Sequence, residues 1–557
     1  MKREDVKHED PRGRFSCFTS SRFTLLLLAI LQFSLFLNHR DITTSHEGRV
    51  ASTAREMLAD HDWIVPHSNG LPRVVKPPLP YWAVAVTWKI VGSIDGWSAR
   101  LPGALLGAIA VLLVMDLGRR VLGREGGIVA GLVWISTWFI IDEYRKAMAD
   151  PYLAFFTLLS VWAWVAAPPA PTPRQSALPP RTVLILLFYI SAGIAAMAKG
   201  HLILIHLPLA IVPYQLFRRR APGRPVVHVI GIVLMLLIAL PWFVYVLKHV
   251  PDTMHEWQED AAAANATVGP KQSPWFHYLA NLPLTAAPWT VLLIVGLLMP
   301  WLGRRRRERR HAWVVVWLLL TVLVFSLVPM KKNTYLLPAM PAQTLIIAAP
   351  IVAALRSRRQ TAGDRFLFCA HAVAAAAAVC VMLGLVLSTD RIDMERPGPL
   401  LAAAGVGIFL LIGAKSLSPH LVSVRTFALT ALGFALAVHG AEAWLIPDAD
   451  NRRSDANFAL TVNSNAADGA PLYLIGDGLR EDVLFYLART VPVIPSPDRL
   501  PADYKGYAIV TADQYAAVGR LDRADEIGQS ADRPAKERLH LMRFPKDPNF
   551  QQRQRER

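Results

Sequence analysis

The sequence predicts an α-helical membrane protein that crosses the bilayer many times and carries a small α/β domain at its C-terminal end. Hydrophobic residues make up 53% of the chain and charged residues only 18%, and the mean hydropathy is +0.32. Long apolar runs alternate with short arginine-rich segments, which is typical of polytopic membrane proteins. Beyond about residue 450 these runs give way to shorter alternating strand-like and helix-like segments.

About thirteen apolar segments are expected to be membrane helices. They are 23–37, 98–118, 126–142, 151–168, 181–198, 202–217, 226–248, 284–302, 312–329, 335–354, 367–388, 399–414 and 424–446. One more apolar segment, 79–92, is expected to lie flat at the membrane interface as an amphipathic juxtamembrane helix. The alternative, in which 79–92 crosses the bilayer, would put the basic N-terminal tail on the side opposite the arginine-rich loops.

The distribution of lysine and arginine sets the expected orientation. Residues 1–22 and the loops on the same side hold 27 Lys and Arg, whereas the opposite loops beyond the first hold 9. Positive residues gather on the cytoplasmic side of membrane proteins. We therefore expect a cytoplasmic tail at 1–22, an inner-membrane domain at 23–446 with its first external loop at 38–97, and an extracytoplasmic soluble domain and tail at 447–557.

The C-terminal part has the pattern of a small α/β domain. PLYLIGD (471–477), EDVLFYLAR (481–489) and VPVIP (491–495) read as strand, helix and strand. YAIVT (507–511) followed by ADQYAAVG (512–519) repeats strand and helix.

Composition excludes several other classes of protein. The net charge is +17, but the basic residues are spread over many short loops, so nucleic-acid binding is not expected. Cys17, Cys369 and Cys380 are the only cysteines, too few for a disulfide framework or a cysteine-based metal site. The first apolar segment is followed by Asn38-His39-Arg40 rather than a small-residue cleavage site, so a retained anchor is expected.

The first external loop is the most polar sequence close to the membrane. Thr44 and Glu47 have the spacing of a capping box, which predicts a helix over about 47–58. Five prolines between residues 66 and 80 predict loop or turn for the second half. A loop so rich in charge beside a lipid phase is where we expect chemistry.

Further charged residues recur at helix ends on the same side of the membrane. Each has a structural explanation: Asp150-Pro151 fits a helix N-terminus, and Lys199-Gly200 fits a helix C-terminus. Taken together they suit an anionic lipid headgroup, since lysines hold a phosphate and a nearby carboxylate takes or holds a proton. The set is Glu47, Lys76, Asp150, Lys199, Lys331 and Lys332.

The first loop resembles that of membrane glycosyltransferases of the GT-C fold, which use polyprenyl-phosphate sugars. This group includes the lipid A aminoarabinose transferases and the protein O-mannosyltransferases. The similar stretches, in family order, are HEGRVASTAREMLADHDWIVPHSNGLPRVVKPPLPYW, RKAMADPYLAFF (145–156), AMAKGHL (196–202), PWFHYLANLPLTAAPW (274–289) and FSLVPMKKNTYLLPAMPA (325–342). The last third resembles the family only in layout.

The resemblance implies a donor-binding group and a catalytic group of residues. The residues implied to lie around the lipid phosphate of the donor are Lys76, Arg49, Lys199, Lys332 and Tyr335. Asp150 matches a second acidic position of the site, beside Glu47 in the first loop.

His46 is the main departure from the family pattern, which begins its first loop with Asp-Glu where this chain has His46-Glu47. His46 could itself be the base, because an imidazole titrates near neutral pH. Glu47 or Asp41 could take over the carboxylate role. His46, Glu47 and Asp150 could together hold a divalent metal ion, the one cofactor considered. A diverged, inactive enzyme is the fourth alternative.

The favoured hypothesis is inverting transfer of a sugar from a polyprenyl-phosphate donor to a lipid, glycan or protein acceptor on the extracytoplasmic face. Cleavage of the sugar C1–O bond leaves a phosphate dianion, which lysine and arginine stabilise. A transporter or flippase for an anionic lipid is the alternative, and a lipid-handling partner without catalysis is another. A transporter of paired halves should show an internal repeat or charges at helix centres, and neither is evident.

Overall fold

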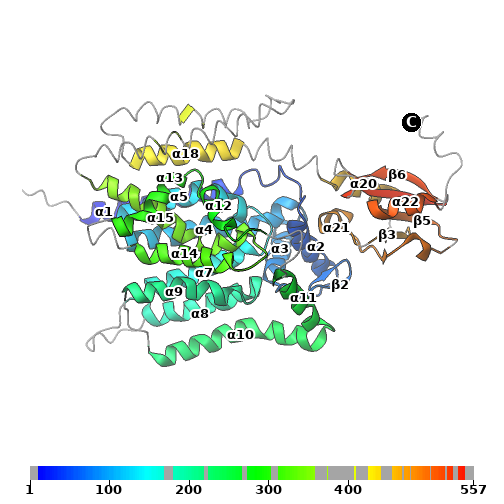
Figure 1. The fold of residues 1–557 in the computed structure, drawn as a ribbon, viewed down its shortest axis with the longest axis horizontal. Helices are drawn as coiled ribbons and strands as arrows, with labels where there is room; N and C mark the ends of the chain where they lie inside the picture. The colour runs from blue at the N-terminus through cyan, green and yellow to red at the C-terminus, as the bar shows by residue number, and fades with distance from the viewer. Residues whose placement is uncertain are drawn as a thin grey trace, which may run out of the picture. The chain divides into compact units, whose positions relative to one another are not determined.

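A computed structural model describes residues 11–168, 180–218, 224–265, 273–302, 311–357, 424–440 and most of 454–545, together with a few isolated positions between 370 and 408. It divides into two compact units (Figure 1). The first, here the membrane unit, comprises Met1–Leu35, Val75–Pro77 and Gly103–Ala441. The second, here the loop unit, comprises Phe36–Val74, Pro78–Pro102 and Glu442–Arg557. Most of the first loop thus groups with the C-terminal residues, whereas the sequence placed it with the membrane domain.

The first residues of α4, Gly96–Pro102, belong to the loop unit, and the described part of the membrane unit consists of helices. They are α1 (Pro11–Ser34), α4 (Gly96–Leu122), α5 (Arg124–Ser136), α6 (Trp138–Tyr144), α7 (Asp150–Ala166), α8 (Pro180–Lys199), α9 (Leu202–Arg218), α10 (Pro225–His249), α11 (Thr253–Asn265), α12 (His277–Thr285), α13 (Thr290–Leu302), α14 (Ala312–Ser326), the 3-10 helix η1 (Asn333–Ala339), α15 (Met340–Leu355) and α18 (Val424–Gly440). Every expected membrane segment in the described residues coincides with one or two of these helices. The expected segments 367–388 and 399–414 lie almost wholly outside the described residues.

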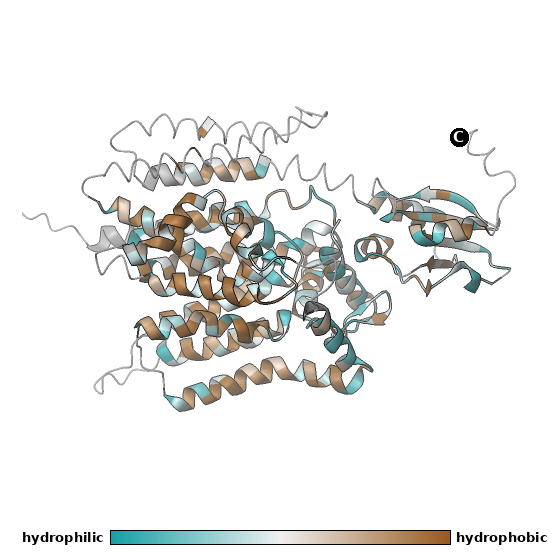
Figure 2. Cartoon of the chain, viewed as in Figure 1, coloured by the Kyte–Doolittle hydropathy of each residue, from teal (hydrophilic) through white to brown (hydrophobic). Residues whose placement is uncertain are grey.

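Several helices have the length and composition of membrane spans. Within the described residues, four are long and apolar enough, and the number rises to six if each of two bent pairs forms one span. The bent pairs are α5 with α6, at 62°, and α12 with α13, at 115°. Apolar residues dominate α7, α10, α13, α14 and α15, whereas α11 is largely hydrophilic (Figure 2). The chain is therefore an integral membrane protein.

Large aromatic side chains fill the interior of the membrane unit. Trp134 and Trp289 are completely buried, and each satisfies its indole N–H, because an unpaired buried donor is costly. Trp134 donates to the Gly107 carbonyl at 3.0 Å, and Trp289 donates to the Ser136 hydroxyl at 3.1 Å. A Cβ on Gly107 would lie only 2.8 Å from the Tyr144 side chain, so this position requires glycine for close helix packing.

In the loop unit, α2 (Ser45–Ala59) begins where the capping box predicts a helix. The Thr44 hydroxyl accepts a hydrogen bond from the Glu47 N–H at 3.3 Å, which satisfies a backbone donor of the first turn. The Glu47 side chain does not complete the reciprocal half of the box. It points inward and pairs with Arg100 instead.

The proline-rich half of the first loop is a turn followed by a short helix. Strands β1 (His67–Ser68) and β2 (Leu71–Pro72) pair antiparallel around Asn69-Gly70, which both have positive φ, as tight hairpin turns require. The Glu56 carboxylate accepts hydrogen bonds from both turn N–H groups, at 2.7 and 3.0 Å. The expected juxtamembrane helix is present as α3 (Leu79–Val91).

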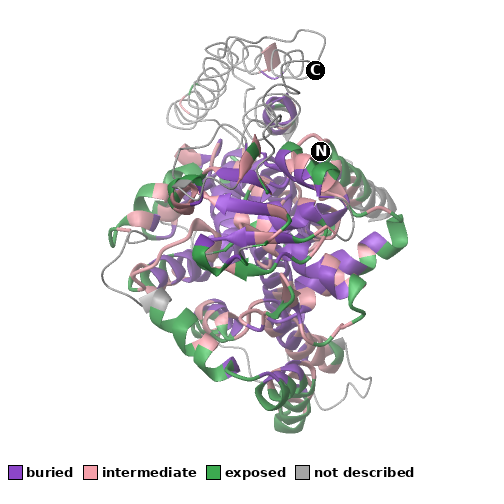
Figure 3. Ribbon diagram, turned by 90° about the vertical axis from the view of Figure 1, so that its right-hand side faces the viewer, coloured by how far each residue is buried: buried purple, intermediate pink, exposed green. Residues whose placement is uncertain are grey.

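The C-terminal residues form a five-stranded sheet of order β4-β3-β5-β7-β6. Its elements are α20 (Ala456–Asn465), β3 (Leu472–Ile475), α21 (Glu481–Leu487), β4 (Val493–Ile494), η3 (Pro497–Arg499), β5 (Gly506–Thr511), α22 (Ala512–Arg520), β6 (Asp525–Gln529) and β7 (Leu539–Phe544). The pairs β3–β4 and β3–β5 are parallel, whereas β5–β7 and β6–β7 are antiparallel. Strands and helices lie where the patterns at 471–519 predict them, around a buried interior (Figure 3).

Helix α2 packs directly on α21 within the loop unit. A Cβ on Gly48 would lie 2.3 Å from the backbone nitrogen of Asp482, so only glycine permits this approach. The Arg55 guanidinium donates to the carbonyls of Leu484 and Phe485 near the end of α21. The first loop and the C-terminal domain are thus joined by backbone contact as well as by side chains.

Candidate active site

A buried ion pair joins two helix ends in the membrane unit. Asp150 is the first residue of α7 and Lys199 is the last of α8, and Lys199 Nζ lies 2.6 Å from Asp150 Oδ1. Their side chains are only 8% and 11% exposed. Asp150 also accepts a hydrogen bond from Thr334 and experiences the positive charge of Lys332. The sequence-predicted residues Asp150, Lys199 and Lys332 are therefore brought together.

Tyr335 completes this cluster from the 3-10 helix η1. The Lys199 ammonium lies 5.1 Å from the centroid of the Tyr335 ring, a distance typical of a cation–π contact. Both Asp150 and Asp260 act electrostatically on the Tyr335 hydroxyl. Tyr335 thus connects the Asp150–Lys199 pair with a second acidic residue that the sequence did not single out.

That second acidic residue, Asp260 of α11, holds Lys76. The Lys76 Nζ lies 2.9 Å from Asp260 Oδ2, and the two side chains are 34% and 51% exposed. The short segment Val75–Pro77 belongs to the membrane unit although its neighbours in sequence do not. An exposed ion pair of this kind is weak, so the Lys76 ammonium is accessible to a competing anion.

Lys331, the neighbour of Lys332, has a structural role. Its ammonium donates to the carbonyls of Val328 and Ser273, at 2.9 and 3.1 Å. It therefore satisfies one backbone acceptor just beyond the end of α14 and another in the segment before α12.

His206 is a residue of this cluster that the sequence analysis missed. It lies on α9, is 1% exposed, and stacks on Phe325 at 4.9 Å between ring centroids. Both Asp150 and Lys199 act on it electrostatically. Neither of its ring nitrogens has a hydrogen-bond partner among the described residues. A lone histidine in an apolar helix gives no sequence signal that separates it from an ordinary core residue.

The turn before α7 carries another group of charges. Lys146 pairs with Asp142 at 2.6 Å and with Glu143 at 2.8 Å. Burial alone lowers the pKa of Lys146, but the two carboxylates more than offset it and raise the pKa above its ordinary value. Lys146 is therefore a fixed cation, and its role in holding this turn is structural.

The other predicted residues of the first loop, unlike Lys76, lie in the loop unit, where two of them make structural ion pairs. Glu47 is completely buried and faces Arg100, whose Nε and Nη2 lie 2.8 and 3.1 Å from its carboxylate oxygens. Arg49 donates to Glu481 from Nε at 2.8 Å and from Nη2 at 2.6 Å. His46 is exposed on the same helix. The geometry thus engages Glu47 and Arg49 in holding the loop unit together.

The metal alternative stays a prediction. Among the residues that the structure describes, no three His, Cys, Asp or Glu side chains lie close enough together to hold a metal ion. His46 and Glu47 lie in the loop unit, and Asp150 lies in the membrane unit. The chemistry available to the cluster in the membrane unit is that of lysines, carboxylates and a tyrosine.

Comparison with known proteins finds similarity to membrane glycosyltransferases. A family model described as dolichyl-phosphate-mannose-protein mannosyltransferase matches residues 75–245. The structure of ArnT from Cupriavidus metallidurans matches with a TM-score of 0.72 at 19% identity, covering 95% of this chain and 98% of that one. The same protein bound to undecaprenyl phosphate matches with a TM-score of 0.71, covering 96% and 98% at 19% identity.

Curated relatives point to the same group. The undecaprenyl phosphate-α-4-amino-4-deoxy-L-arabinose arabinosyl transferase 1 of Sodalis glossinidius is 28% identical over 58% of each chain. The corresponding transferase of Erwinia tasmaniensis is 28% identical over 75% of this chain and 76% of its own. The chain spans about 58% of the length of the first of these relatives. The resemblance to GT-C glycosyltransferases that use polyprenyl-phosphate sugars is therefore confirmed.

Proposed function

We propose that this protein is a membrane glycosyltransferase that moves a sugar from a polyprenyl-phosphate donor to an acceptor on the extracytoplasmic face. The observation that carries the proposal is the cluster of Lys76, Lys199, Lys332 and Tyr335 with Asp150 in a unit that has the ArnT fold. The names of the relatives favour 4-amino-4-deoxy-L-arabinose on undecaprenyl phosphate as the donor. The resembled group includes the lipid A aminoarabinose transferases, so lipid A is the acceptor proposed ahead of glycan and protein acceptors.

The chemistry follows from the charges of the cluster. An acceptor oxygen attacks sugar C1 as the bond from C1 to the phosphate oxygen breaks, and the acceptor proton leaves as the new C1–O bond forms. The released polyprenyl phosphate carries one more negative charge than the donor. Lys76, Lys199 and Lys332 are the cations that stabilise it. Attack from the face opposite the leaving phosphate inverts the configuration at C1.

Two residues, one in each unit, are alternative candidates for the base that takes the acceptor proton. Asp150 is the carboxylate that lies among these cations, and Lys199 and Thr334 fix its orientation. His46 is exposed on α2 and carries an imidazole suited to proton transfer near neutral pH. Glu47 is a weaker candidate than the sequence suggested, because Arg100 occupies both of its oxygens.

The direct test measures transfer by the purified full-length protein. The donor is undecaprenyl-phosphate aminoarabinose, the acceptor is lipid A, and mass spectrometry detects the modified product. Asp150→Asn is expected to abolish transfer, and His46→Ala is expected to reduce it if the imidazole carries the proton. Movement of the donor lipid across a vesicle membrane without any transfer would support the transporter alternative.

Binding of undecaprenyl phosphate tests the phosphate site separately. Lys76→Gln is expected to weaken binding by about ten- to a hundredfold, the value of a charge-assisted hydrogen bond. Lys248→Gln, which removes an exposed lysine from the last turn of α10, is the matched control and should bind as the wild type does. Unchanged affinity in Lys76→Gln removes Lys76 from the site.

We further propose the membrane topology that the charges predict, with about thirteen spans, a cytoplasmic N-terminus and residues 447–557 outside. The segments placed on the cytoplasmic side hold 27 Lys and Arg, and the opposite loops beyond the first hold 9, which supports this orientation. Labelling of single-cysteine variants from each side of the membrane tests it, and an N-terminus that is reached only from outside would reverse the assignment.

A further inference from the structure

Lys332, one of the proposed phosphate cations, lies in a segment that belongs to no helix or strand. Its backbone is extended, with φ −132° and ψ 133°, between the end of α14 and the start of η1. Backbone N–H and C=O groups outside regular structure need partners from other elements. The residues that follow include Thr334 and Tyr335, which also belong to the cluster around Asp150. The position of this segment therefore matters for the whole cluster.

Tyr278, the second residue of α12, holds the backbone of Lys332 through both of its polar groups. The Tyr278 hydroxyl donates to the Lys332 carbonyl at 3.1 Å and accepts from the Lys332 N–H at 3.1 Å. Tyr278 is completely buried, so its surroundings strengthen these two bonds relative to bonds in water. Neither bond involves the Lys332 ammonium, which acts electrostatically on Asp150. Tyr278 thus fixes the backbone of Lys332 and leaves its charge to the cluster.

The neighbours of Lys332 on both sides are bonded to the same part of the chain. His277 Nε2 donates to Asn333 Oδ1 at 3.0 Å, and Lys331 Nζ donates to the Ser273 carbonyl at 3.1 Å. Three consecutive residues are therefore each bonded to the short segment around the start of α12. Because adjacent residues of one helix supply two of these contacts, the contacts hold the segment as a unit.

We propose that Tyr278 is a positioning residue for the transfer reaction, because it holds Lys332 where its ammonium reaches the phosphate of the polyprenyl-phosphate donor. The inference rests on the proposed function, in which Lys332 is a phosphate-binding cation. Electrostatic attraction falls as the distance between charges grows, and groups of a working site must be held within about 0.5 Å of their productive positions. Tyr278 acts through Lys332 and does not itself contact the donor.

The test is a double-mutant cycle on the binding of undecaprenyl phosphate to the full-length protein in detergent. Tyr278→Phe keeps the ring and removes both hydrogen bonds, so it is expected to lower the affinity about three- to tenfold. Lys332→Gln should lower the affinity as well, since it removes a cation. In the Lys332→Gln background, Tyr278→Phe should change the affinity by less than about twofold, because a positioning residue has no effect once the group that it positions is gone.

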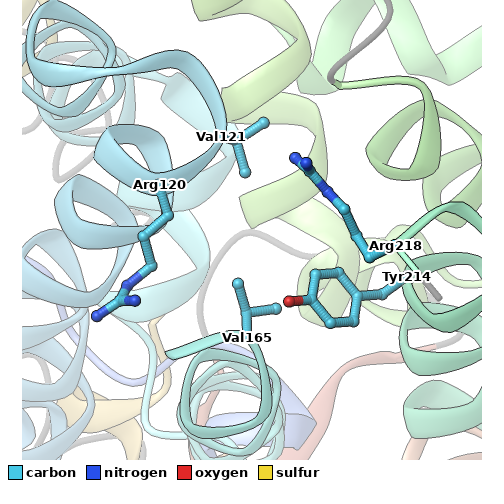
Figure 4. Close-up of a pocket in the computed structure, with 5 residues that line it drawn as sticks. All are labelled: Arg120, Val121, Val165, Tyr214 and Arg218. Carbon is cyan, nitrogen blue, oxygen red and sulfur yellow. The ribbon is translucent and has the colours of Figure 1, made fainter. Parts of the chain in front are cut away.

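Tyr214→Phe is the matched control. Tyr214 is a buried tyrosine of α9 that lines a small cavity together with Val165 of α7 (Figure 4). Val165 follows Asp150 by fifteen residues on α7, a separation of about 22 Å along the helix axis. Tyr214→Phe removes a tyrosine hydroxyl far from the cluster, so its affinity should equal that of the wild type. An equal loss in this control would overturn the proposal.

His277→Phe gives a second and milder variant. It removes the bond to Asn333 and leaves both bonds of Tyr278, so it should lower the affinity less than Tyr278→Phe does, and again only while Lys332 is present. Thermal unfolding of each variant separates a binding loss from misfolding. If Tyr278→Phe does not fold, the same cycle is run with His277→Phe.

The outcomes separate this inference from the proposed function. Equal losses from Tyr278→Phe with and without Lys332 would show that Tyr278 acts on the lipid directly or on the fold as a whole. Wild-type affinity in Tyr278→Phe, with weakened binding in Lys332→Gln, would overturn the positioning role and leave the phosphate site intact. Wild-type affinity in Lys332→Gln would remove Lys332 from the proposed phosphate site, and the positioning role with it.

Discussion

Breaking the Asp150–Lys199 pair should affect stability and activity in ways that can be separated. Lys199→Met leaves the Asp150 carboxylate buried without its main partner, and Asp150→Asn leaves the ammonium in the same situation. Removal of one member of a buried pair typically costs about 3–5 kcal/mol of unfolding free energy. The side chains are 8% and 11% exposed, so solvent screens the pair little.

For Lys199→Met we expect a loss of unfolding free energy at the lower end of the range for a broken buried ion pair. Asp150 keeps its hydrogen bond from Thr334 and the field of Lys332, so the estimate is about 3 kcal/mol. The double variant Asp150→Asn/Lys199→Met contains no unpaired charge and should regain most of the lost stability. Unfolding in mixed micelles of increasing denaturing detergent gives the three free energies.

Transfer activity separates the two roles of the pair. If Asp150 and Lys199 act on substrate, the double variant regains stability but transfers no sugar. A double variant that recovers both would show that the pair is only structural. If the losses of unfolding free energy in the two single variants add up to the loss in the double variant within about 0.5 kcal/mol, Asp150 and Lys199 are not coupled.

Three other substitutions follow from single contacts. Asp260→Asn frees Lys76 from a weak exposed ion pair worth up to about 1 kcal/mol. The affinity for undecaprenyl phosphate should therefore rise up to about fivefold. A lower affinity would show that Asp260 itself contacts the ligand. His206→Phe removes two buried ring nitrogens that lack hydrogen-bond partners among the described residues, and it should raise the unfolding free energy by about 1 kcal/mol. Transfer activity is lost as well if the imidazole contacts the substrate. A variant that unfolds more easily than the wild type would contradict the expected stabilisation. Glu47→Gln removes the negative charge that faces Arg100 and should lower the unfolding free energy by about 3 kcal/mol or more. An unfolding free energy equal to that of the wild type would mean that the Glu47–Arg100 pair does not stabilise the fold.

The helices and the first loop could be predicted because their signals are local. Apolar length predicts the spans, the spacing of Thr44 and Glu47 predicts the start of α2, and proline predicts the turn after it. The strands and helices at 472–520 follow from sequence patterns of five to nine residues. All of these features depend on neighbours within a few residues.

The partners of the charged residues could not be predicted, since they come from distant parts of the chain. Arg49 pairs with Glu481, 432 residues away, and Lys76 pairs with Asp260, 184 residues away. Periodicity carries no information about such contacts. The motif match singled out Lys76, Lys199 and Asp150, which the structure places in the membrane unit, together with Glu47, which pairs with Arg100 in the loop unit.

The pairing of the lysines has a consequence for substrate binding. Lys76 and Lys199 already face carboxylates, so a lipid phosphate must displace or share these partners rather than meet bare cations. The exposed Lys76–Asp260 pair is easily exchanged, whereas the buried Lys199–Asp150 pair resists separation. If the proposed phosphate site is correct, we expect phosphate to enter at Lys76 and to gain the charge of Lys199 without breaking the Lys199–Asp150 ion pair. Displacing the Asp260 carboxylate from Lys76 offsets part of the attraction between the lysines and the phosphate. We therefore expect the proposed cations to stabilise the leaving phosphate and still to allow the product to dissociate.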